Sequence, residues 1–222
     1  MINTIDTVGV RFKNDTVQIL LSRRDKNPYE GEYALPGGWV FEDQDKNLSD
    51  AVERVIKTKT NHQLSYYEQV HTIGNSQRDP RDWSVTVVYL CLFSSNPLPE
   101  NKQDVKWVEV NKILSDEFSL PFDHKDLVAL AMERLRSKAM YTTLPGFLCE
   151  DVFSMKDYQN VAEQVIGSKL NDRGLRIRLE ESNALVDAKM TRQTGKRPAK
   201  LFRLADRDKP RNFDRMMYGK AK

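Results

Sequence analysis

A helix-forming segment beginning at Arg54 carries lysines where a phosphate-cleaving helix would need carboxylates. The segment reads RVIKTKTN and includes Lys57 and Lys59. Glutamates on such a helix would hold Mg²⁺ against a pyrophosphate, whose charge must be neutralised before water can attack. Lysines at these positions repel a divalent cation. The segment therefore predicts a helix that lacks the carboxylate ligands for the Mg²⁺ that hydrolysis requires.

Acidic residues close to this helix leave a metal-dependent alternative open. Glu42, Asp43 and Asp45 precede the helix, and Glu53 lies within it. Glu42, Asp43 or Glu53 could replace the missing pair in a hydrolase of nucleoside diphosphates. Because the lysines that follow oppose a cation, we expect no catalytic residues and no metal site.

Glycine, aromatic and arginine residues in the first half of the chain are candidate ligand contacts. Glycines let backbone amides approach a ligand, although a tight turn alone also requires glycine. Aromatic rings can stack on adenine or fill a core. Loop arginines can hold a pyrophosphate through charge-assisted hydrogen bonds, or can pair with Asp79 and Asp82. The expected ligand-binding residues are Arg23, Gly37, Gly38, Trp39, Arg54, Arg78, Arg81 and Trp83.

Hydrophobic periodicity predicts that a mixed α/β domain positions these residues. β-Branched and apolar runs at 4–12 and 16–22 flank Lys-Asn-Asp, the pattern of a β-hairpin. Residues 47–59 carry apolar side chains at three- and four-residue spacing, which predicts a helix capped by Asn47 or Ser49. Further strands are expected at 67–73, 84–93 and 105–110, and another amphipathic helix at 124–138.

The pattern changes after a connector at 142–152 that contains Pro and Gly. Residues 153–166 predict a helix with Ser154 as its cap, 170–185 predict a second helix, and 186–204 predict two extended runs around a basic turn. Helix, helix and hairpin in this order are typical of a winged helix-turn-helix. The expected parts are a ligand-sensing domain at 1–141, a linker at 142–152, a DNA-binding domain at 153–206 and a polar tail at 207–222 that is expected to fray.

Charge is divided unevenly between the two expected domains. The first 150 residues hold 18 basic and 22 acidic side chains, a net charge of −4, whereas the remainder hold 17 basic and 10 acidic ones, a net charge of +7. A concentrated positive domain attracts polyanions. No stretch approaches the roughly 20 apolar residues that span a bilayer, and the N-terminus has no signal-peptide pattern. We therefore expect a cytoplasmic protein without a membrane partner.

Basic residues in the C-terminal part are candidate DNA contacts. Arginine on a major-groove helix can bind guanine through two hydrogen bonds, and 100° per residue directs Arg173 and Arg176 to one side and Arg178 elsewhere. The tip of the hairpin can contact phosphate or enter the minor groove. A solvated basic helix and a plain surface hairpin are the alternatives. The expected DNA-binding residues are Lys169, Arg173, Arg176, Arg178, Arg192, Lys196 and Arg197.

Five segments, ordered along nearly the whole chain, resemble the NrtR family of Nudix-related transcriptional regulators of bacterial NAD metabolism. They are LPGGWV, NSQRDPRDWSVTVVY, LPFDHKDLVALAMERLRSKAMY, LPGF and GKRPAKLF. Within the Nudix signature, Gly37, Gly38 and Arg54 match. Its glutamates and closing glycine are replaced by Val55, Thr58, Lys59 and Asn61.

This resemblance implies an α/β Nudix-like mixed-sheet sandwich followed by an α+β winged helix-turn-helix domain. It further implies a regulator, expected to be a repressor, of NAD biosynthesis or salvage genes. Such a protein binds a palindromic operator on double-stranded DNA as a homodimer. ADP-ribose or a related nucleotide is the effector that releases it, and no cofactor is required. The alternatives are an active ADP-ribose or nucleoside-diphosphate Nudix hydrolase, and a Nudix-related regulator that responds to sugars such as arabinose.

Overall fold

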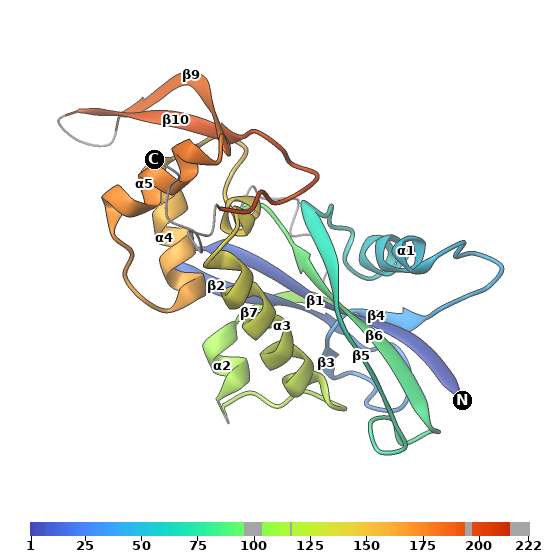
Figure 1. Cartoon of the computed structure of the whole chain (residues 1–222). Helices are drawn as coiled ribbons and strands as arrows, with labels where there is room; N and C mark the ends of the chain where they lie inside the picture. Colours follow the sequence, from blue (N-terminus) through green and yellow to red (C-terminus); the bar gives the residue numbers. More distant parts are fainter. Residues whose placement is uncertain (96–103, 116, 194–196, 214–222) are drawn as a thin grey trace, which may run out of the picture.

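A seven-stranded mixed sheet organises the N-terminal part of the chain (Figure 1). The computed structural model describes residues 1–95, 104–115, 117–193 and 197–213. The central strands of the sheet, β1 (Ile2–Lys13) and β6 (Ser84–Leu92), run parallel, and the other pairings in this sheet are antiparallel. The order is β3 (Tyr33–Ala34), β2 (Thr16–Arg23), β1, β6 and β5 (Tyr66–Asn75), with β4 (Gly37–Trp39) beside β1 and β7 (Val105–Glu109) beside β2.

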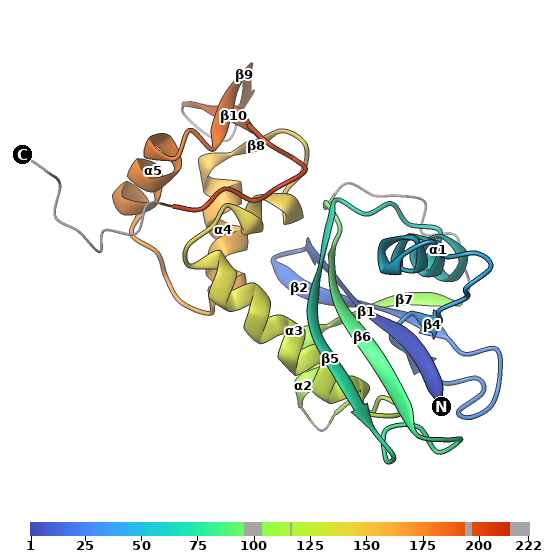
Figure 2. The same ribbon diagram turned by 45° about the vertical axis from the view of Figure 1, so that its right-hand side comes forward.

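Helices cover both faces of this sheet (Figure 2). Helix α1 (Leu48–Thr60) buries Ala51, Val52, Val55 and Ile56 in a cluster with Ile5 and Leu20. On the opposite face, α3 (His124–Ala139) buries Leu127, Val128, Ala131 and Leu135 in a second cluster, and the short α2 (Val110–Leu114) packs beside it. At 16 residues, α3 is the longest helix in the described ranges, and no helix there is long and apolar enough to cross a membrane.

Local signals set the ends of α1. The Asn47 side chain accepts a hydrogen bond from the Asp50 N–H, as expected of one of the two cap candidates. At the other end, Asn61 adopts a left-handed conformation with φ of 57°, and its N–H binds the Lys57 carbonyl. The helix therefore ends where the lysine-rich segment ends.

The C-terminal part forms the predicted winged helix. Helix α4 (Met155–Ile166) follows the short strand β8 (Phe153–Ser154), and α5 (Asp172–Glu181) leads into the hairpin of β9 (Leu185–Gln193) and β10 (Pro198–Leu204). The second helix is shorter than the predicted range 170–185. It ends because Asn183 turns to a φ of 50°, which carries Leu185 into a strand.

The connector between the two domains is buried from Thr142 to Cys149. The 3₁₀ helix η1 (Leu144–Leu148) is buried at all five positions, and Phe147 packs on Tyr66 of β5 with ring centroids 5.1 Å apart. One hydrophobic cluster contains side chains of the large sheet, α3, η1 and the winged helix. The two domains therefore share a core across the expected linker.

The segment expected to be a frayed tail is packed where the structure describes it. Asn212 forms a bridge with Thr142, the Arg211 guanidinium donates to the Asn183 carbonyl at 3.0 Å, and Phe213 is buried. Residues 214–222 lie outside the described part. The expectation of fraying is therefore wrong for residues 207–213, because they pair with the connector.

Ser154→Ala is expected to reduce the free energy of unfolding by about 1 kcal/mol, because Ser154 caps α4. Its hydroxyl accepts from the Asp157 N–H at 3.2 Å, and the Asp157 carboxylate accepts from the Ser154 N–H at 2.8 Å, forming a capping box. Urea unfolding of the full chain measures the change. Ser168→Ala in the exposed α4–α5 loop is the control, and an equal effect of both substitutions would contradict the capping role.

Candidate functional site

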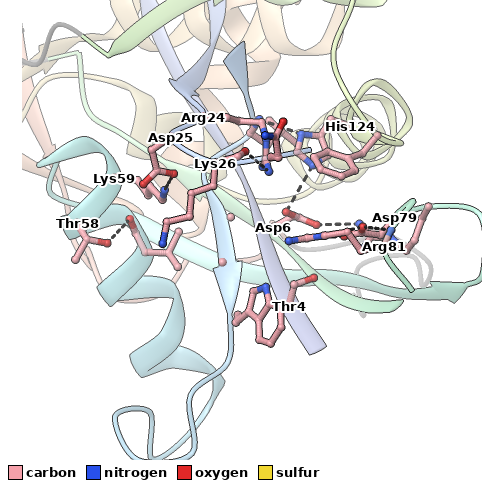
Figure 3. A pocket seen from close by; sticks show the side chains of 18 of the residues that line it. Thr4, Asp6, Arg24, Asp25, Lys26, Thr58, Lys59, Asp79, Arg81 and His124 are labelled. Atoms are coloured by element: carbon pink, nitrogen blue, oxygen red, sulfur yellow. Dashed lines mark hydrogen bonds and ion pairs between the residues drawn. The ribbon is translucent and has the colours of Figure 1, made fainter. Parts of the chain in front are cut away.

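A pocket of about 450 Å³ is lined by β1, β4, α1, the loop after β2, the β5–β6 loop and the residues that begin α3. Figure 3 shows its polar side chains converging from these separate elements. Six of its lining side chains are Lys or Arg and three are Asp. This excess of positive charge suits a polyanionic ligand. The cations are Arg24, Lys26, Arg54, Lys59, Arg78 and Arg81, and the acids are Asp6, Asp25 and Asp79.

Arg78 is the buried centre of the charge network in this pocket. Its guanidinium donates to Asp6 of β1 at 3.0 Å, to both oxygens of Asp123 at 3.0 and 3.1 Å, and to the Ser84 hydroxyl at 3.1 Å. Only 5% of the Arg78 side chain is exposed. Arg78 therefore ties the β5–β6 loop to β1 and to the start of α3.

His124, the first residue of α3, completes this wall. Its Nδ1 accepts a hydrogen bond from the Leu35 N–H at 3.1 Å, and Nε2 lies 3.7 Å from an Asp6 oxygen. Burial lowers the pKa of His124, so the ring is neutral near pH 7. With Nδ1 accepting, the ring proton lies on Nε2 and faces Asp6. His124 thus positions Asp6 and the Leu35 backbone.

Arg54 fixes the loop that precedes α1. It forms two hydrogen bonds with Asp45, at 2.6 and 2.7 Å, and donates to the Trp39 carbonyl at 2.8 Å. The hydrogen bond with Arg54 lowers the pKa of Asp45, whose side chain is only 1% exposed. The Arg54 guanidinium also lies over the Phe41 ring at 4.8 Å. Arg54 therefore orients the aromatic rim of the pocket as well as lining it.

The α1 face directed at the pocket carries Val55, Thr58 and Lys59, the positions at which the resemblance implied glutamates. Lys59 pairs with Asp25 of the opposite loop at 3.1 Å, and this hydrogen bond lowers the pKa of Asp25 (Figure 3). Of the carboxylates proposed as substitutes, Glu53 instead accepts from the Tyr67 hydroxyl at 2.9 Å.

The pocket does not fit the divalent cation that a Nudix hydrolase holds. Its three carboxylates each face a cation, as Asp6 pairs with Arg78, Asp25 with Lys59 and Asp79 with Arg81. Within the described residues, no group of three or more His, Cys, Asp or Glu side chains is arranged to hold a metal. Hard cations require several oxygen ligands, so these paired carboxylates are a poor donor set.

Six of the eight ligand residues expected from the sequence line the pocket, and two do not. The Arg23 Nε donates to the Gly31 carbonyl at 3.0 Å, and Trp83 lies against Gly74. Gly37 is needed for close approach to Asp6, because a Cβ there would lie 2.2 Å from a carboxylate oxygen. The six that line the pocket are Gly37, Gly38, Trp39, Arg54, Arg78 and Arg81.

Sequence reasoning missed Asp6, Arg24, Phe122 and His124. Arg24, next to Arg23, donates to the Pro28 carbonyl at 2.7 Å and lies over the Phe122 ring at 4.8 Å. Neighbouring side chains at the end of a strand point to opposite faces, so this alternation could have shown that only one of the two arginines faces the pocket. For Asp6 and His124 there was no local signal.

The exposed face of α5 carries the basic residues expected to contact DNA. Leu175 and Leu179 are buried, whereas Arg173 and Arg176 are exposed. Arg178 is also exposed but points toward the end of α3, where its guanidinium lies 3.5 Å from the Met140 carbonyl. This arrangement agrees with the predicted separation of Arg178 from the other two arginines.

The remaining DNA candidates differ in their surroundings. Lys169 pairs with Glu163 at 2.6 Å but is 88% exposed, and Arg197 is exposed where β10 begins. Arg192 bonds to Asp157 at 2.9 Å and joins the wing to α4, which gives it a structural role. Lys196 lies outside the described residues, so its position relative to DNA stays a prediction.

The fold and the site together define a Nudix domain followed by a winged helix. The Nudix domain family matches residues 4–131, and the NrtR DNA-binding winged helix domain matches residues 145–204. A relative from Acinetobacter baylyi, described as an ADPR responsive transcriptional repressor, is 37% identical over 96% of this chain and 86% of its own length. The chain therefore belongs to the NrtR family, and the predicted fold class is confirmed.

Solved structures agree with this assignment. Shewanella oneidensis NrtR complexed with a 27mer DNA is 34% identical, with a TM-score of 0.89 over 96% of this chain and all of that one. The Nudix domain of the same protein, complexed with ADP ribose, is 36% identical, with a TM-score of 0.56 over 61% of this chain and 88% of that one.

Proposed function

We propose that this protein is an ADP-ribose-responsive transcriptional repressor that controls genes of NAD biosynthesis or salvage from the cytoplasm. One observation carries the proposal: a single chain contains a positively charged pocket and an arginine-bearing helix, and a shared hydrophobic core joins the domains that hold them. The names of the Acinetobacter and Shewanella relatives support both the effector and the DNA target.

The pocket supports a nucleotide diphosphate as the effector. Its volume lies within the range of sites that hold a compact organic ligand. Lys and Arg side chains offer charge-assisted hydrogen bonds to a diphosphate, and the exposed rings of Trp39 and Phe41 offer apolar surface to a base. A neutral sugar would leave this positive charge uncompensated, so the pocket favours ADP-ribose over arabinose.

The winged helix supports double-stranded DNA as the second partner. Arg173 and Arg176 on α5 suit contacts with guanine in the major groove, and Arg197 near the wing suits the backbone or minor groove. Two copies in a homodimer would read two half-sites, which makes the expected operator a palindrome. ADP-ribose lowers operator affinity by binding better to the form that does not fit DNA.

We further propose that the Nudix domain binds ADP-ribose without efficient hydrolysis and requires no cofactor. Val55, Thr58 and Lys59 on the pocket face of α1 support this, because none of them can ligate Mg²⁺ as a carboxylate does. The hydrolase alternative depends on Glu42, Asp43 or Glu53. These side chains do not line the pocket, and Glu53 is hydrogen-bonded to Tyr67.

Fluorescence anisotropy of the full chain with duplex DNA from upstream of its own and neighbouring genes tests the proposal. We expect binding much tighter than to random DNA of equal length, and release on addition of ADP-ribose. Salt must be held constant, because phosphate contacts make affinity strongly salt-dependent.

An equal affinity for random DNA, with or without ADP-ribose, would refute the repressor function. Conversion of ADP-ribose to AMP with Mg²⁺, lost in Glu53→Gln, would instead support the hydrolase. Release of DNA by arabinose but not by ADP-ribose would support the sugar-responsive alternative.

A further inference from the structure

Lys59 lines the pocket at a position where the resemblance to the Nudix signature implied a glutamate. One face of α1 lines the pocket with Arg54, Val55, Thr58 and Lys59. The Lys59 ammonium reaches across to Asp25 in the loop after β2, at 3.1 Å. Figure 3 shows this pair on the side of the pocket opposite Asp6, Asp79 and Arg81.

We propose that the Lys59 ammonium replaces the divalent cation, so that this protein binds a nucleotide diphosphate without metal. The inference rests on the proposed function and names the residue that gives its pocket metal independence. A lysine is a compact, hydrated point charge with three donors, which suits a diphosphate oxygen in place of a hydrated Mg²⁺.

Two other paired cations of the pocket, Arg54 and Arg78, are less available for this task. Arg78 is 5% exposed and held by two carboxylates, and Arg54 is held by Asp45, which is 1% exposed. In contrast, the side chains of Lys59 and Asp25 are 36% and 68% exposed. Ion pairs this exposed are weak, because water screens them. A diphosphate can therefore displace the Asp25 carboxylate and pair with the Lys59 ammonium in its place.

The position of Lys59 near the C-terminus of α1 adds a second reason for its charge. Lys59 lies in the last turn, where the aligned peptide dipoles give the helix end a partial negative charge. An anionic ligand approaching this end is repelled unless a cation lies between them. Lys59 supplies that cation from the helix itself.

Calorimetric titration of ADP-ribose into the full chain, once with EDTA and once with excess Mg²⁺, tests the proposal. We expect the wild-type Kd to agree between the two buffers to within about twofold. Lys59→Gln is expected to raise the Kd roughly tenfold in both, the loss expected from one hydrogen bond to a charged group. Lys59→Glu is expected to bind more weakly still in EDTA.

Lys57→Gln is the matched control, because Lys57 lies on the same helix turn but lines a different groove. It carries the same charge change and is expected to leave the Kd for ADP-ribose unchanged. Operator affinity without ADP-ribose, which we expect Lys59→Gln to retain, confirms that this variant is folded.

Two results would overturn the proposal while leaving the proposed function intact. One is wild-type binding that disappears in EDTA and returns with Mg²⁺. The other is Lys59→Gln binding ADP-ribose as Lys57→Gln does. If ADP-ribose binds to none of the proteins, the effector of the proposed function is wrong. Titration of inorganic pyrophosphate into the same proteins then decides the role of Lys59, which is refuted if Lys59→Gln and wild type bind it equally.

Discussion

Arg78→Ala is expected to destabilise the protein by about 3–5 kcal/mol, the loss typical of breaking a buried ion pair from one side. Asp6 is 9% exposed and Asp123 is 19% exposed, and both lose their guanidinium partner in this variant. A buried carboxylate without a partner pays the full desolvation penalty. Urea unfolding followed by tryptophan fluorescence measures the change, because all three tryptophans, Trp39, Trp83 and Trp107, lie in the Nudix domain.

Lys112→Ala is the control for Arg78→Ala, since Lys112 forms an exposed ion pair with Glu109 at 3.5 Å. It is expected to change the free energy of unfolding by no more than about 1 kcal/mol. If Arg78→Ala has an effect as small as the control, the Asp6–Arg78–Asp123 network does not stabilise the fold.

Arg173→Ala and Arg176→Ala are each expected to weaken operator binding by about 1–3 kcal/mol, roughly 5-fold to 150-fold in Kd. Both side chains are exposed, whereas Leu175 and Leu179 are the buried residues of α5, so truncation leaves the core intact. Anisotropy titrations with operator and random DNA measure the change. The loss is expected to be larger on the operator, because a base contact contributes little on random sequence.

Two variants separate base contacts from charge alone. Arg197→Ala, beside the wing, is expected to weaken operator and random DNA alike and to reduce the salt dependence. Lys46→Ala removes an exposed charge in the Nudix domain and is expected to leave DNA binding unchanged. If Arg173→Ala and Arg176→Ala resemble Lys46→Ala, the alternative of a solvated basic helix holds.

The secondary structure was largely predictable because its signals are local. The helix predicted at 47–59 differs from α1 by one residue at each end, and the helix predicted at 124–138 differs from α3 by one residue at its C-terminus, since apolar spacing marks their buried faces. The prediction of 170–185 extended too far, because its apolar pattern continued through Leu185. The left-handed turn at Asn183 ends that helix early.

The site was predictable only in part because its centre is assembled from distant residues. Arg78 lies 72 residues from Asp6 and 45 from Asp123, and no spacing rule links such positions. Parallel pairing of β1 with β6 and packing of α3 bring them together. The lysines of α1 were informative because they break a short motif whose chemistry is known.

Helix α3 runs from the wall of the pocket to the winged helix. It begins at His124 in the pocket wall and ends beside Met140, whose carbonyl faces Arg178 of α5. Sixteen residues at about 1.5 Å each make a rod about 24 Å long. A tilt of about 5° at the pocket end moves the far end by about 2 Å, comparable to the helix shifts that switch other proteins. In the proposed homodimer, such a tilt in each subunit would change the distance between the two α5 helices.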